Sequence, residues 1–415
     1  MTRRILVAPA GKRFSPEAGS EDGWIYDIVS GVATIEPEFR FTCIAEKADG
    51  FEPATVDTVQ IGYRRTEELG GLMLPFRNGR AAARLAPLGT VDLVHHALPF
   101  AVGRSFSLLV YQAHQRGIPV VIGPVQTPLE WTGRDELGGQ LDHRDLRRVR
   151  RAATVLAKAA APAAEGVLAA LSADALRRAD RVVVVSQAAQ ALVESAGVDP
   201  GRVEIIPPPT RMPGCPVTGR ELRSGPLRLL TAGYLIDRKG VGDLFRVVAD
   251  LASAGEDVVL DVAGDGPAGP GLWRQARQHQ GGDVIQRHGW VERSKMGDLF
   301  KSADAYVSMS RGESWGQALA DALAYSLVAI SAANIGAQAM AALGAPIRLV
   351  PIGDLNGLTH ELRRLCRLDR VSLAAEGAVA SRWAAKNVAA SVVAERWAAL
   401  YHRAMEQSDG RRGRE

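Results

Sequence analysis

The sequence predicts an α/β protein with two doubly wound, Rossmann-like domains and a cleft between them. Short runs of apolar, β-branched residues alternate with helical segments, as in proteins with parallel sheets. The alternation stops once, at a proline-rich stretch, and then restarts. The 415 residues are enough for two domains with a core each. Two β/α series joined by a linker therefore predict two separate parallel sheets.

The N-terminal domain is predicted over residues 1–206. Its expected strands are bounded by glycine, proline or aspartate, which is typical of short buried strands. They begin at Arg4, Phe41, Val56, Val91, Pro119, Arg181 and Val203. The first apolar run is too short for the hydrophobic region of a signal peptide, so we interpret it as a strand.

A proline-rich linker is predicted over residues 207–224, because Pro207, Pro208 and Pro209 disfavour a helix. A C-terminal domain is predicted over residues 225–385. Its strands are expected to begin at Leu227, Val258, Val284, Asp304, Leu327 and Ile347. A last helix is expected over residues 386–406, and its apolar face, which includes Trp397, must pack on something. Residues 407–415 are expected to form a flexible tail.

Composition and charge disfavour several classes of protein. The 47% hydrophobic and 23% charged residues are typical of a globular protein, and no apolar run approaches the roughly 18 residues of a membrane span. The formal charge of +4 is weak evidence for nucleic acid binding, so no such partner is expected. Cys43, Cys215 and Cys366 lack the spacing of a disulfide framework or a zinc site. These features fit a cytoplasmic protein.

An arginine-rich segment, residues 128–170, departs from the regular alternation. It is helical in propensity, and five arginines lie between residues 144 and 151. We interpret it as a solvated helical insertion, with acceptor binding and docking on an anionic membrane as alternatives. Membrane association is not expected, because no stripe of large apolar residues opposes the arginines.

Several loops at predicted strand ends carry residues suited to binding phosphates and sugars. Arg238 and Lys239 lie between Gly233 and Gly240, and an adjacent Arg and Lys can hold a diphosphate. A Gly-Asp-Gly-Pro turn begins at residue 264, and Trp290 follows a further strand. Each feature alone has an ordinary explanation: a solvated basic pair, a structural turn, or a tryptophan used in packing.

The stretch Ser310–Ile330 has the order strand, loop, helix, strand, with Glu313 in the loop. The start of such a helix presents unpaired N–H groups and the positive end of its dipole. Four consecutive loops at one edge of a parallel sheet are expected to line a single cleft. The sequence therefore predicts a site for a ligand with phosphates and hydroxyls at this edge.

The motifs of the C-terminal half resemble those of the family 4 retaining glycosyltransferases (glycosyl transferases group 1), which have the two-domain GT-B fold. The resemblance is carried by residues 233–240, 262–267, 288–292 and 300–324, in the order and spacing of the family, and more weakly by 179–210. The N-terminal half resembles the family only loosely. The resemblance also implies that the last helix crosses back to the N-terminal domain.

The resemblance implies roles for individual residues. Arg238 and Lys239 match the basic pair that holds the donor diphosphate, and Glu313 matches the acid that contacts the donor sugar. Asp321 stands where the family usually has a glutamate that grips the ribose, so a longer or water-bridged contact is an alternative to a direct one. Further donor-binding residues are implied, mostly through their backbones: Gly23, Gly233, Gly289, Trp290, Val291, Ser314, Trp315, Gly316 and Gln317.

Two adjacent histidines, His95 and His96, lie near the place where the family commonly has a histidine close to the reacting sugar. Neighbouring side chains on a strand point to opposite faces, so only one of the two is expected to face the cleft. A buried, hydrogen-bonded structural histidine is the alternative for either. The acceptor side is expected near Thr127 and Trp131.

The resemblance implies transfer with retention and no covalent enzyme intermediate, which requires positioning and charge stabilisation. No cofactor or metal is expected: there is no Asp-x-Asp motif, and Asp142 and Asp145 have the wrong spacing. The predicted function is transfer of a sugar from a nucleotide-diphosphate sugar, with UDP or GDP, to a small polar acceptor. A nucleotide-sugar epimerase and a non-catalytic nucleotide-sugar-binding protein are the alternatives. The oligomeric state stays open, with a homodimer among the options.

Overall fold

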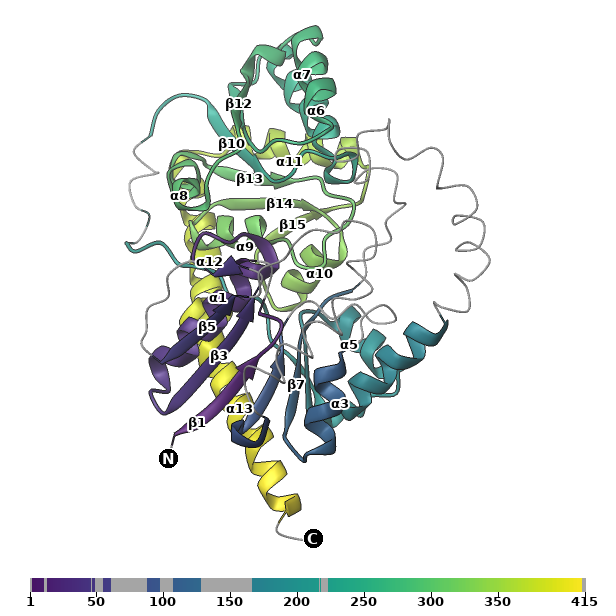
Figure 1. The fold of residues 1–415 in the computed structure, drawn as a ribbon. Helices are drawn as coiled ribbons and strands as arrows, with labels where there is room; N and C mark the ends of the chain where they lie inside the picture. Colours follow the sequence, from purple (N-terminus) through teal and green to yellow (C-terminus); the bar gives the residue numbers. More distant parts are fainter. Residues whose placement is uncertain are drawn as a thin grey trace. The chain divides into compact units, whose positions relative to one another are not determined.

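The computed structural model describes residues 2–10, 13–45, 47–48, 55–60, 88–97, 107–127, 166–215, 217 and 223–412. The chain divides into two compact units (Figure 1). Of the described residues, unit 1 holds those up to residue 127, residues 166–209 and those from Val393 onward, and unit 2 holds Thr210–Val392. The chain thus leaves unit 1 after Pro209, within the proline-rich segment, and rejoins it at Val393.

Unit 1 contains a parallel sheet with the strand order β5-β3-β1-β6-β7-β8-β9. The strands are β1 (Arg3–Val7), β3 (Phe39–Ala45), β5 (Val56–Gln60), β6 (Leu93–His96), β7 (Val120–Val125), β8 (Arg181–Val184) and β9 (Val203–Ile205). The order reverses between β1 and β6, and ligands of doubly wound sheets bind at the carboxyl ends of the strands beside such a reversal. A small ladder of β2 (Arg13–Phe14) and β4 (Lys47–Ala48) was not predicted.

The helices of unit 1 connect these strands and cover their apolar side chains. They are α1 (Ser20–Ile35), α3 (Leu108–Gln115), the helical residues 166–178 and α5 (Gln187–Ser195), with short turns η1 (Leu88–Thr90) and η3 (Pro200–Arg202). The long α13 (Ala390–Arg412) buries Val393, Trp397, Leu400 and Tyr401, so its apolar face packs as its pattern requires. It continues to Arg412, beyond residue 406 where the last helix was expected to end: adding residues to an existing helix avoids the cost of nucleation.

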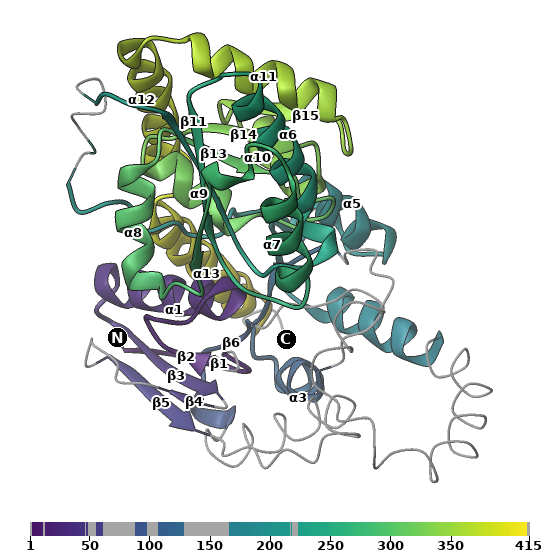
Figure 2. The same cartoon turned by 90° about the horizontal axis from the view of Figure 1, so that it is seen from above.

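Unit 2 contains a second parallel sheet, with the order β12-β11-β10-β13-β14-β15. The strands are β10 (Leu227–Ala232), β11 (Val258–Ala263), β12 (Ile285–Gly289), β13 (Ala305–Ser308), β14 (Val328–Ala332) and β15 (Ile347–Val350). The helices are α6 (Val241–Ser253), α7 (Gly269–Gln278), α8 (Arg293–Ser302), α9 (Gln317–Ala324), α10 (Ile335–Ala342), α11 (Leu355–Arg367) and α12 (Arg370–Asn387), with the turns η5 (Asp237–Lys239) and η6 (Gly282–Val284). Figure 2 shows α6 and α7 on one side of the sheet and α8 on the other. The order reverses between β10 and β13, whose carboxyl ends are followed by the loops with Arg238 and Glu313.

Every apolar run that the sequence predicts as a strand contains a strand of one of the two sheets. The predicted α/β architecture is therefore confirmed. The runs were recognisable because strands buried on both faces are almost continuously apolar. In unit 2, for example, all six residues of β11 are buried.

An aspartate directly before a strand ties neighbouring strands together in both units. In each case a carboxylate oxygen accepts a hydrogen bond from a backbone N–H of the neighbouring strand. The acids are Asp92, Asp180 and Asp304, and the donors are the amides of Arg4, Val120 and Arg228, at 2.7, 2.9 and 2.8 Å. These contacts fix the amino ends of the strands, at the edge opposite the functional loops.

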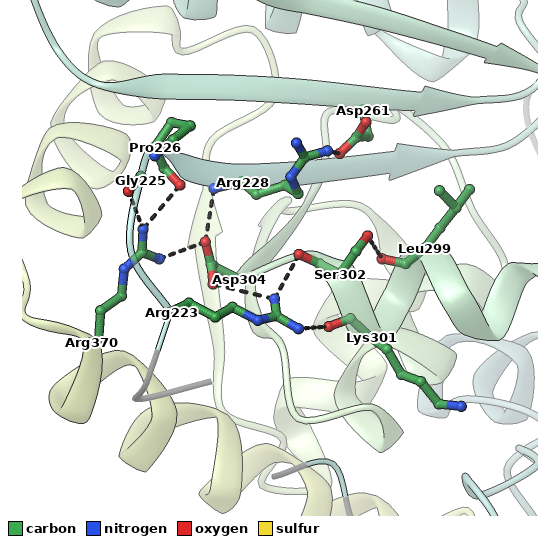
Figure 3. A network of polar contacts seen from close by, with 10 residues as sticks. All are labelled: Arg223, Gly225, Pro226, Arg228, Asp261, Leu299, Lys301, Ser302, Asp304 and Arg370. Atoms are coloured by element: carbon green, nitrogen blue, oxygen red, sulfur yellow. Dashed lines mark hydrogen bonds and ion pairs between the residues drawn. The ribbon is translucent and has the colours of Figure 1, made fainter. Parts of the chain in front are cut away.

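Asp304 is also the centre of a charged network at the start of unit 2 (Figure 3). Its carboxylate accepts from Arg370 at 2.6 Å and lies 3.8 Å from Arg223. Arg370 is the first residue of α12 and also donates to the carbonyls of Gly225 and Pro226. The network thus joins the end of the proline-rich segment to the sheet and to α12.

Candidate active site

Three consecutive loops at the carboxyl edge of the unit 2 sheet are joined by backbone hydrogen bonds. The N–H of Gly233 donates to Ala263 O at 2.9 Å, and the N–H of Gly264 donates to Gly289 O at 2.7 Å. The loops after β10, β11 and β12 therefore lie side by side. This is the arrangement that the spacing of the motifs predicts for a common ligand site.

The basic pair Arg238 and Lys239 lies in the tight turn η5. The next residue, Gly240, has φ +63°, and a Cβ there would lie 2.2 Å from Met309 O. Only glycine meets both requirements without strain. The turn is therefore packed against the end of β13. This packing places the basic pair next to the loop that follows β13.

Lys239 and Arg238 converge on Glu313. Lys239 Nζ lies 2.6 Å from Glu313 Oε1, and Arg238 Nη1 lies 3.7 Å from the same oxygen. Arg238 also donates to the carbonyl of Gly312, and its buried Nε has no hydrogen-bond partner among the residues that the structure describes. Two cations share one carboxylate, so positive charge remains for an anionic ligand.

The loop with Glu313 is held by the start of α10. The Glu313 carbonyl accepts from the N–H of Gly336 at 2.8 Å, and Asn334 donates its side-chain amide to Ser310 O at 2.9 Å. Ser314 is buried, and the Trp315 side chain is only 1% exposed. Trp315 thus anchors the loop in the core.

Gly316 is the N-cap of α9 and has φ +98°, a conformation that favours glycine. The side chain of Gln317, the first residue of the helix, donates to Asp321 Oδ1 at 2.8 Å and to Thr210 Oγ1 at 3.2 Å. Asp321, at the position of the family's ribose-binding glutamate, is therefore bonded within its own helix. Its carboxylate is half-buried.

The residues expected near the nucleotide base follow β12. Gly289 has φ +69° and closes the strand, and Val291 is half-buried. The side chain of Trp290 is 74% exposed. Packing in the core is therefore excluded as the role of Trp290, and its ring is accessible to a ligand.

A cavity of about 700 Å³ opens on another side of the same turn, between the starts of α6 and α7. Asp237, Gly240 and Arg311 contribute to its wall, whereas Arg238, Lys239 and Glu313 do not. An ion pair of Arg311 and Asp243, at 3.0 Å, lies in this wall. Because charges of both signs line the cavity, it has no clear preference for a diphosphate.

His95 is completely buried in unit 1, and both of its ring nitrogens are hydrogen-bonded. Nε2 donates to Gly123 O at 2.8 Å, and Nδ1 accepts from the Tyr401 hydroxyl at 2.8 Å. Its ring also lies 4.8 Å from that of Trp397. Burial lowers the pKa of His95 to about 4. These contacts match the structural alternative for His95, with a neutral ring.

His96 is the last residue of β6 and is also buried. Burial, and to a smaller extent the neighbouring His95, lower its pKa to about 3, so its ring is neutral at pH 7. Because the two side chains alternate across the strand, His96 points away from Trp397 and Tyr401. Its side chain thus lies on the face of the strand opposite to that of His95.

The structure corrects the helix start that was expected at Gly23. Helix α1 begins at Ser20 with Gly19 as its N-cap, so Gly23 lies within the first turn and its N–H is directed at Gly19 O, at 3.4 Å. The paired acids and Gly19 before it favour this earlier start. Thr127, two residues after β7, is 9% exposed. Trp131, Asp142, Asp145 and residues 128–165 lie outside the described residues.

Among the described residues, one group of three side chains is arranged so that it could hold a metal ion: Glu36, Glu38 and His402. It lies at the amino end of β3 in unit 1, away from the carboxyl ends of the strands. Within the described part, none of the helices has the length and apolar character needed to span a membrane.

Two contacts of the site region were not anticipated from the sequence. One is the bond from Gln317 to Thr210, and the other is the bond from Tyr401 to His95. Both join residues that are more than 100 positions apart, and local sequence patterns do not predict such pairs. For the second contact, the apolar face of α13 indicated that the helix packs on the protein but not which residue Tyr401 contacts.

Comparison with known proteins agrees with the motifs. A model described as Glycosyltransferase Family 4 matches residues 35–211, and one described as Glycosyl transferases group 1 matches residues 219–369. D-inositol 3-phosphate glycosyltransferase 2 of Catenulispora acidiphila is 31% identical over 232 residues, which cover 51% of each chain. The GPI3 subunit of phosphatidylinositol N-acetylglucosaminyltransferase of Saccharomyces cerevisiae is 26% identical over 163 residues, 38% of this chain and 36% of that one. The chain thus matches about half or less of the length of these curated relatives.

Solved structures resemble the whole chain. Sucrose-phosphate synthase from Thermosynechococcus elongatus has a TM-score of 0.66 at 16% identity, covering 97% of this chain and 99% of that one. Anabaena HepE, in complex with UDP-glucose, has a TM-score of 0.63 at 15% identity, covering 95% and 98%. The two family models and the shared fold identify this chain as a member of the family 4 glycosyltransferases, with the GT-B fold.

Proposed function

We propose that this protein is a retaining glycosyltransferase that moves a sugar from a nucleotide-diphosphate sugar to a small polar acceptor, without a metal ion. The observation that carries the proposal is the convergence of Arg238 and Lys239 on Glu313 at the carboxyl ends of β10 and β13. A diphosphate needs cations and a sugar needs hydrogen-bond acceptors. This cluster supplies both.

In the proposed reaction the bond between the anomeric carbon and the diphosphate oxygen breaks, and the acceptor hydroxyl forms a new bond on the same face. The departing phosphate oxygen takes the acceptor proton, so no enzyme nucleophile is needed. Arg238 and Lys239 stabilise the negative charge that develops on the diphosphate. Glu313 accepts hydrogen bonds from sugar hydroxyls, while phosphate oxygens compete with it for Lys239.

Of the two histidines we assign the contact with substrate to His96. Its low pKa makes it a neutral hydrogen-bonding group at pH 7 rather than a cation. His95 is occupied by Gly123 and Tyr401 and contributes to the fold. The pair therefore divides into one structural residue and one functional residue.

The nucleotide we propose is UDP, with GDP as the second choice. The support for UDP is the HepE structure, a protein of the same fold in complex with UDP-glucose. The exposed ring of Trp290 is available to stack on the base. For the acceptor, the names of both curated relatives contain inositol, so phosphorylated inositols belong in the acceptor screen.

The test begins with thermal unfolding in the presence of UDP, GDP and ADP and their sugars, because a ligand that binds the folded state raises the Tm. The nucleotide that raises the Tm is then assayed as its sugar, with and without acceptors, by mass spectrometry. Transfer that persists in a chelator supports the proposal. A binding protein would leave the donor intact, an epimerase would change its sugar without transfer, and either result would reject the proposed activity.

A further inference from the structure

The two places where the chain passes between the units are tied together within unit 2. Thr210, within the proline-rich stretch, is the residue at which the chain enters this unit, and Val388, Ala389 and Ala390 lie shortly before the chain leaves it again. The N–H of Thr210 donates to Val388 O at 2.7 Å, and the N–H of Ala390 donates to Thr210 O at 3.0 Å. We call this parallel pairing of Thr210 with residues 388–390 the crossover bridge.

A side chain at the start of α9 connects the crossover bridge to the proposed donor loop. Gln317, the first residue of α9, donates one N–H to Thr210 Oγ1 at 3.2 Å and the other to Asp321 Oδ1 at 2.8 Å. A primary amide has two N–H groups, so it can make both bonds at once. The Thr210 side chain is fully buried, which shelters its hydrogen bond from competition with water.

The helices on either side strengthen this connection. Helix α9 packs against α12, and α12 leads directly into the crossover bridge. Helix α9 begins at Gln317, and its N-cap, Gly316, lies close to Glu313. A displacement of the first turn of α9 therefore reaches the bridge by two routes: through the Gln317 side chain and through α12.

We propose that Gln317 is a positioning residue that couples occupancy of the donor site to the geometry of the crossover bridge through Thr210. The inference rests on the proposed function, because it assumes that a nucleotide binds at the start of α9. At this point the ligand oxygens would bind the backbone N–H of Gln317, while the Thr210 hydroxyl binds its side chain. Coupling is reciprocal, so ligand binding stabilises the bridge as much as the bridge stabilises ligand binding.

The test is hydrogen exchange of the full-length protein with and without saturating UDP. In the wild type, UDP is expected to slow exchange about fivefold or more in the peptides that contain Thr210 and Ala390, which corresponds to a coupling of about 1 kcal/mol. Gln317→Met removes both donors and keeps the length of the side chain. Thr210→Val removes the acceptor oxygen and leaves the backbone pairing possible. Calorimetry is expected to show that both variants bind UDP. In both variants, UDP is expected not to slow hydrogen exchange in the peptides of the crossover bridge.

Thr359→Val is the matched control, because Thr359 bonds only to Leu355 O within α11 among the contacts described. It should retain the full effect of UDP. Equal slowing in Gln317→Met and in the wild type would overturn the proposal, even with UDP bound. Failure of the wild type to bind either UDP or GDP in calorimetry would instead reject the nucleotide site itself, and the coupling with it. As a second measurement, the effects of Gln317→Met and Thr210→Val on donor kcat/KM should be non-additive, since both variants remove the same hydrogen bond between Gln317 and Thr210.

Discussion

Tyr401 donates its hydroxyl to Nδ1 of His95 across 2.8 Å, although the two residues are 306 positions apart. The bond fixes the tautomer of the histidine, because Nδ1 must accept and Nε2 must therefore carry the proton that it gives to Gly123 O. It also fixes α13 to the sheet of unit 1, together with the ring contact between Trp397 and His95. The histidine is thus part of the attachment of the last helix.

Replacing Tyr401 by phenylalanine should destabilise unit 1 by about 1–3 kcal/mol. The ring packing is kept, but Nδ1 of His95 becomes a buried acceptor without a donor. The free energy of unfolding in urea measures the change. Tyr234→Phe is the control, since the Tyr234 side chain is 47% exposed. If both substitutions have the same small effect, the buried hydrogen bond does not contribute to stability.

The unfolding free energy should decrease as the pH falls from 7 toward 4. Burial lowers the pKa of His95 to about 4 and that of His96 to about 3, from 6.5. In this range the unfolded chain binds protons at both histidines and the folded chain does not, so protons favour unfolding. Each histidine contributes a slope of about 1.4 kcal/mol per pH unit at most.

Urea titrations at pH 7, 6 and 5 measure this slope, and His96→Gln should remove one of its two contributions. A slope that is the same in the wild type and in His96→Gln would contradict the burial of a neutral His96. The comparison of slopes is useful because the other histidines and the carboxylates titrate equally in both proteins.

The strands could be predicted from sequence because each is a short apolar run with recognisable ends. The helix ends were less predictable: α1 begins at Ser20 rather than near Gly23, and α13 continues to Arg412. Helix ends depend on weak local preferences that differ by about 1 kcal/mol or less between neighbouring positions. Burial of an apolar run involves several times that energy, so the strands are determined more strongly.

The convergence of Arg238, Lys239 and Glu313 could be predicted because parallel strands bring the loops after β10 and β13 to one edge. The different environments of His95 and His96 could not be predicted. The strand pattern implies that their side chains point to opposite faces, but it does not show which face α13 covers. The partner of Asp321 could not be predicted either. A carboxylate four residues after Gln317 on a helix has several options, and only the folded site shows that it bonds to that amide.

Glu313→Gln and Lys239→Met should affect binding and turnover in different ways. Glu313→Gln frees the cations from their carboxylate, so UDP affinity should hold or rise, whereas transfer should fall on the order of 100-fold with the loss of a charged sugar contact. Lys239→Met should lower the affinity for UDP roughly tenfold or more, since it removes the charge-assisted hydrogen bond expected between Lys239 and the diphosphate. Calorimetry with UDP and initial rates with the donor sugar separate the two effects.

The exposed Lys301 provides the control for charge in the same unit, and Lys301→Met should leave UDP affinity unchanged. If Glu313→Gln lowers the affinity for UDP as much as Lys239→Met does, Glu313 contributes to diphosphate binding by positioning the basic pair. The division of roles between sugar and phosphate would then be wrong.

Asp304→Asn should destabilise unit 2 by about 2–3 kcal/mol. The carboxylate is buried and accepts from Arg370 and from the amide of Arg228, and its neutral replacement leaves the arginine without a charge partner. Because Arg370 is partly exposed, the loss should be smaller than for a fully buried pair. Urea denaturation followed by intrinsic tryptophan fluorescence would measure it, with Asp283→Asn, at an exposed position, as control. A loss no larger than that of the control would show that the network in Figure 3 does not stabilise the unit.

Asp321→Glu restores the acid that the family usually has, and we expect it to increase UDP affinity about three- to tenfold. The carboxylate of Asp321 is engaged by Gln317 at 2.8 Å, and one more methylene would carry it past that amide toward a ribose hydroxyl. Asp321→Asn keeps an oxygen for Gln317 and removes only the charge, so it should weaken UDP less than about threefold. The opposite pattern, a loss of tenfold or more in Asp321→Asn and a loss in Asp321→Glu, would mean that the aspartate itself grips the ribose. Calorimetry of the three proteins with UDP, and with uridine as the ligand that lacks the diphosphate, distinguishes a ribose contact from an effect on the phosphate site.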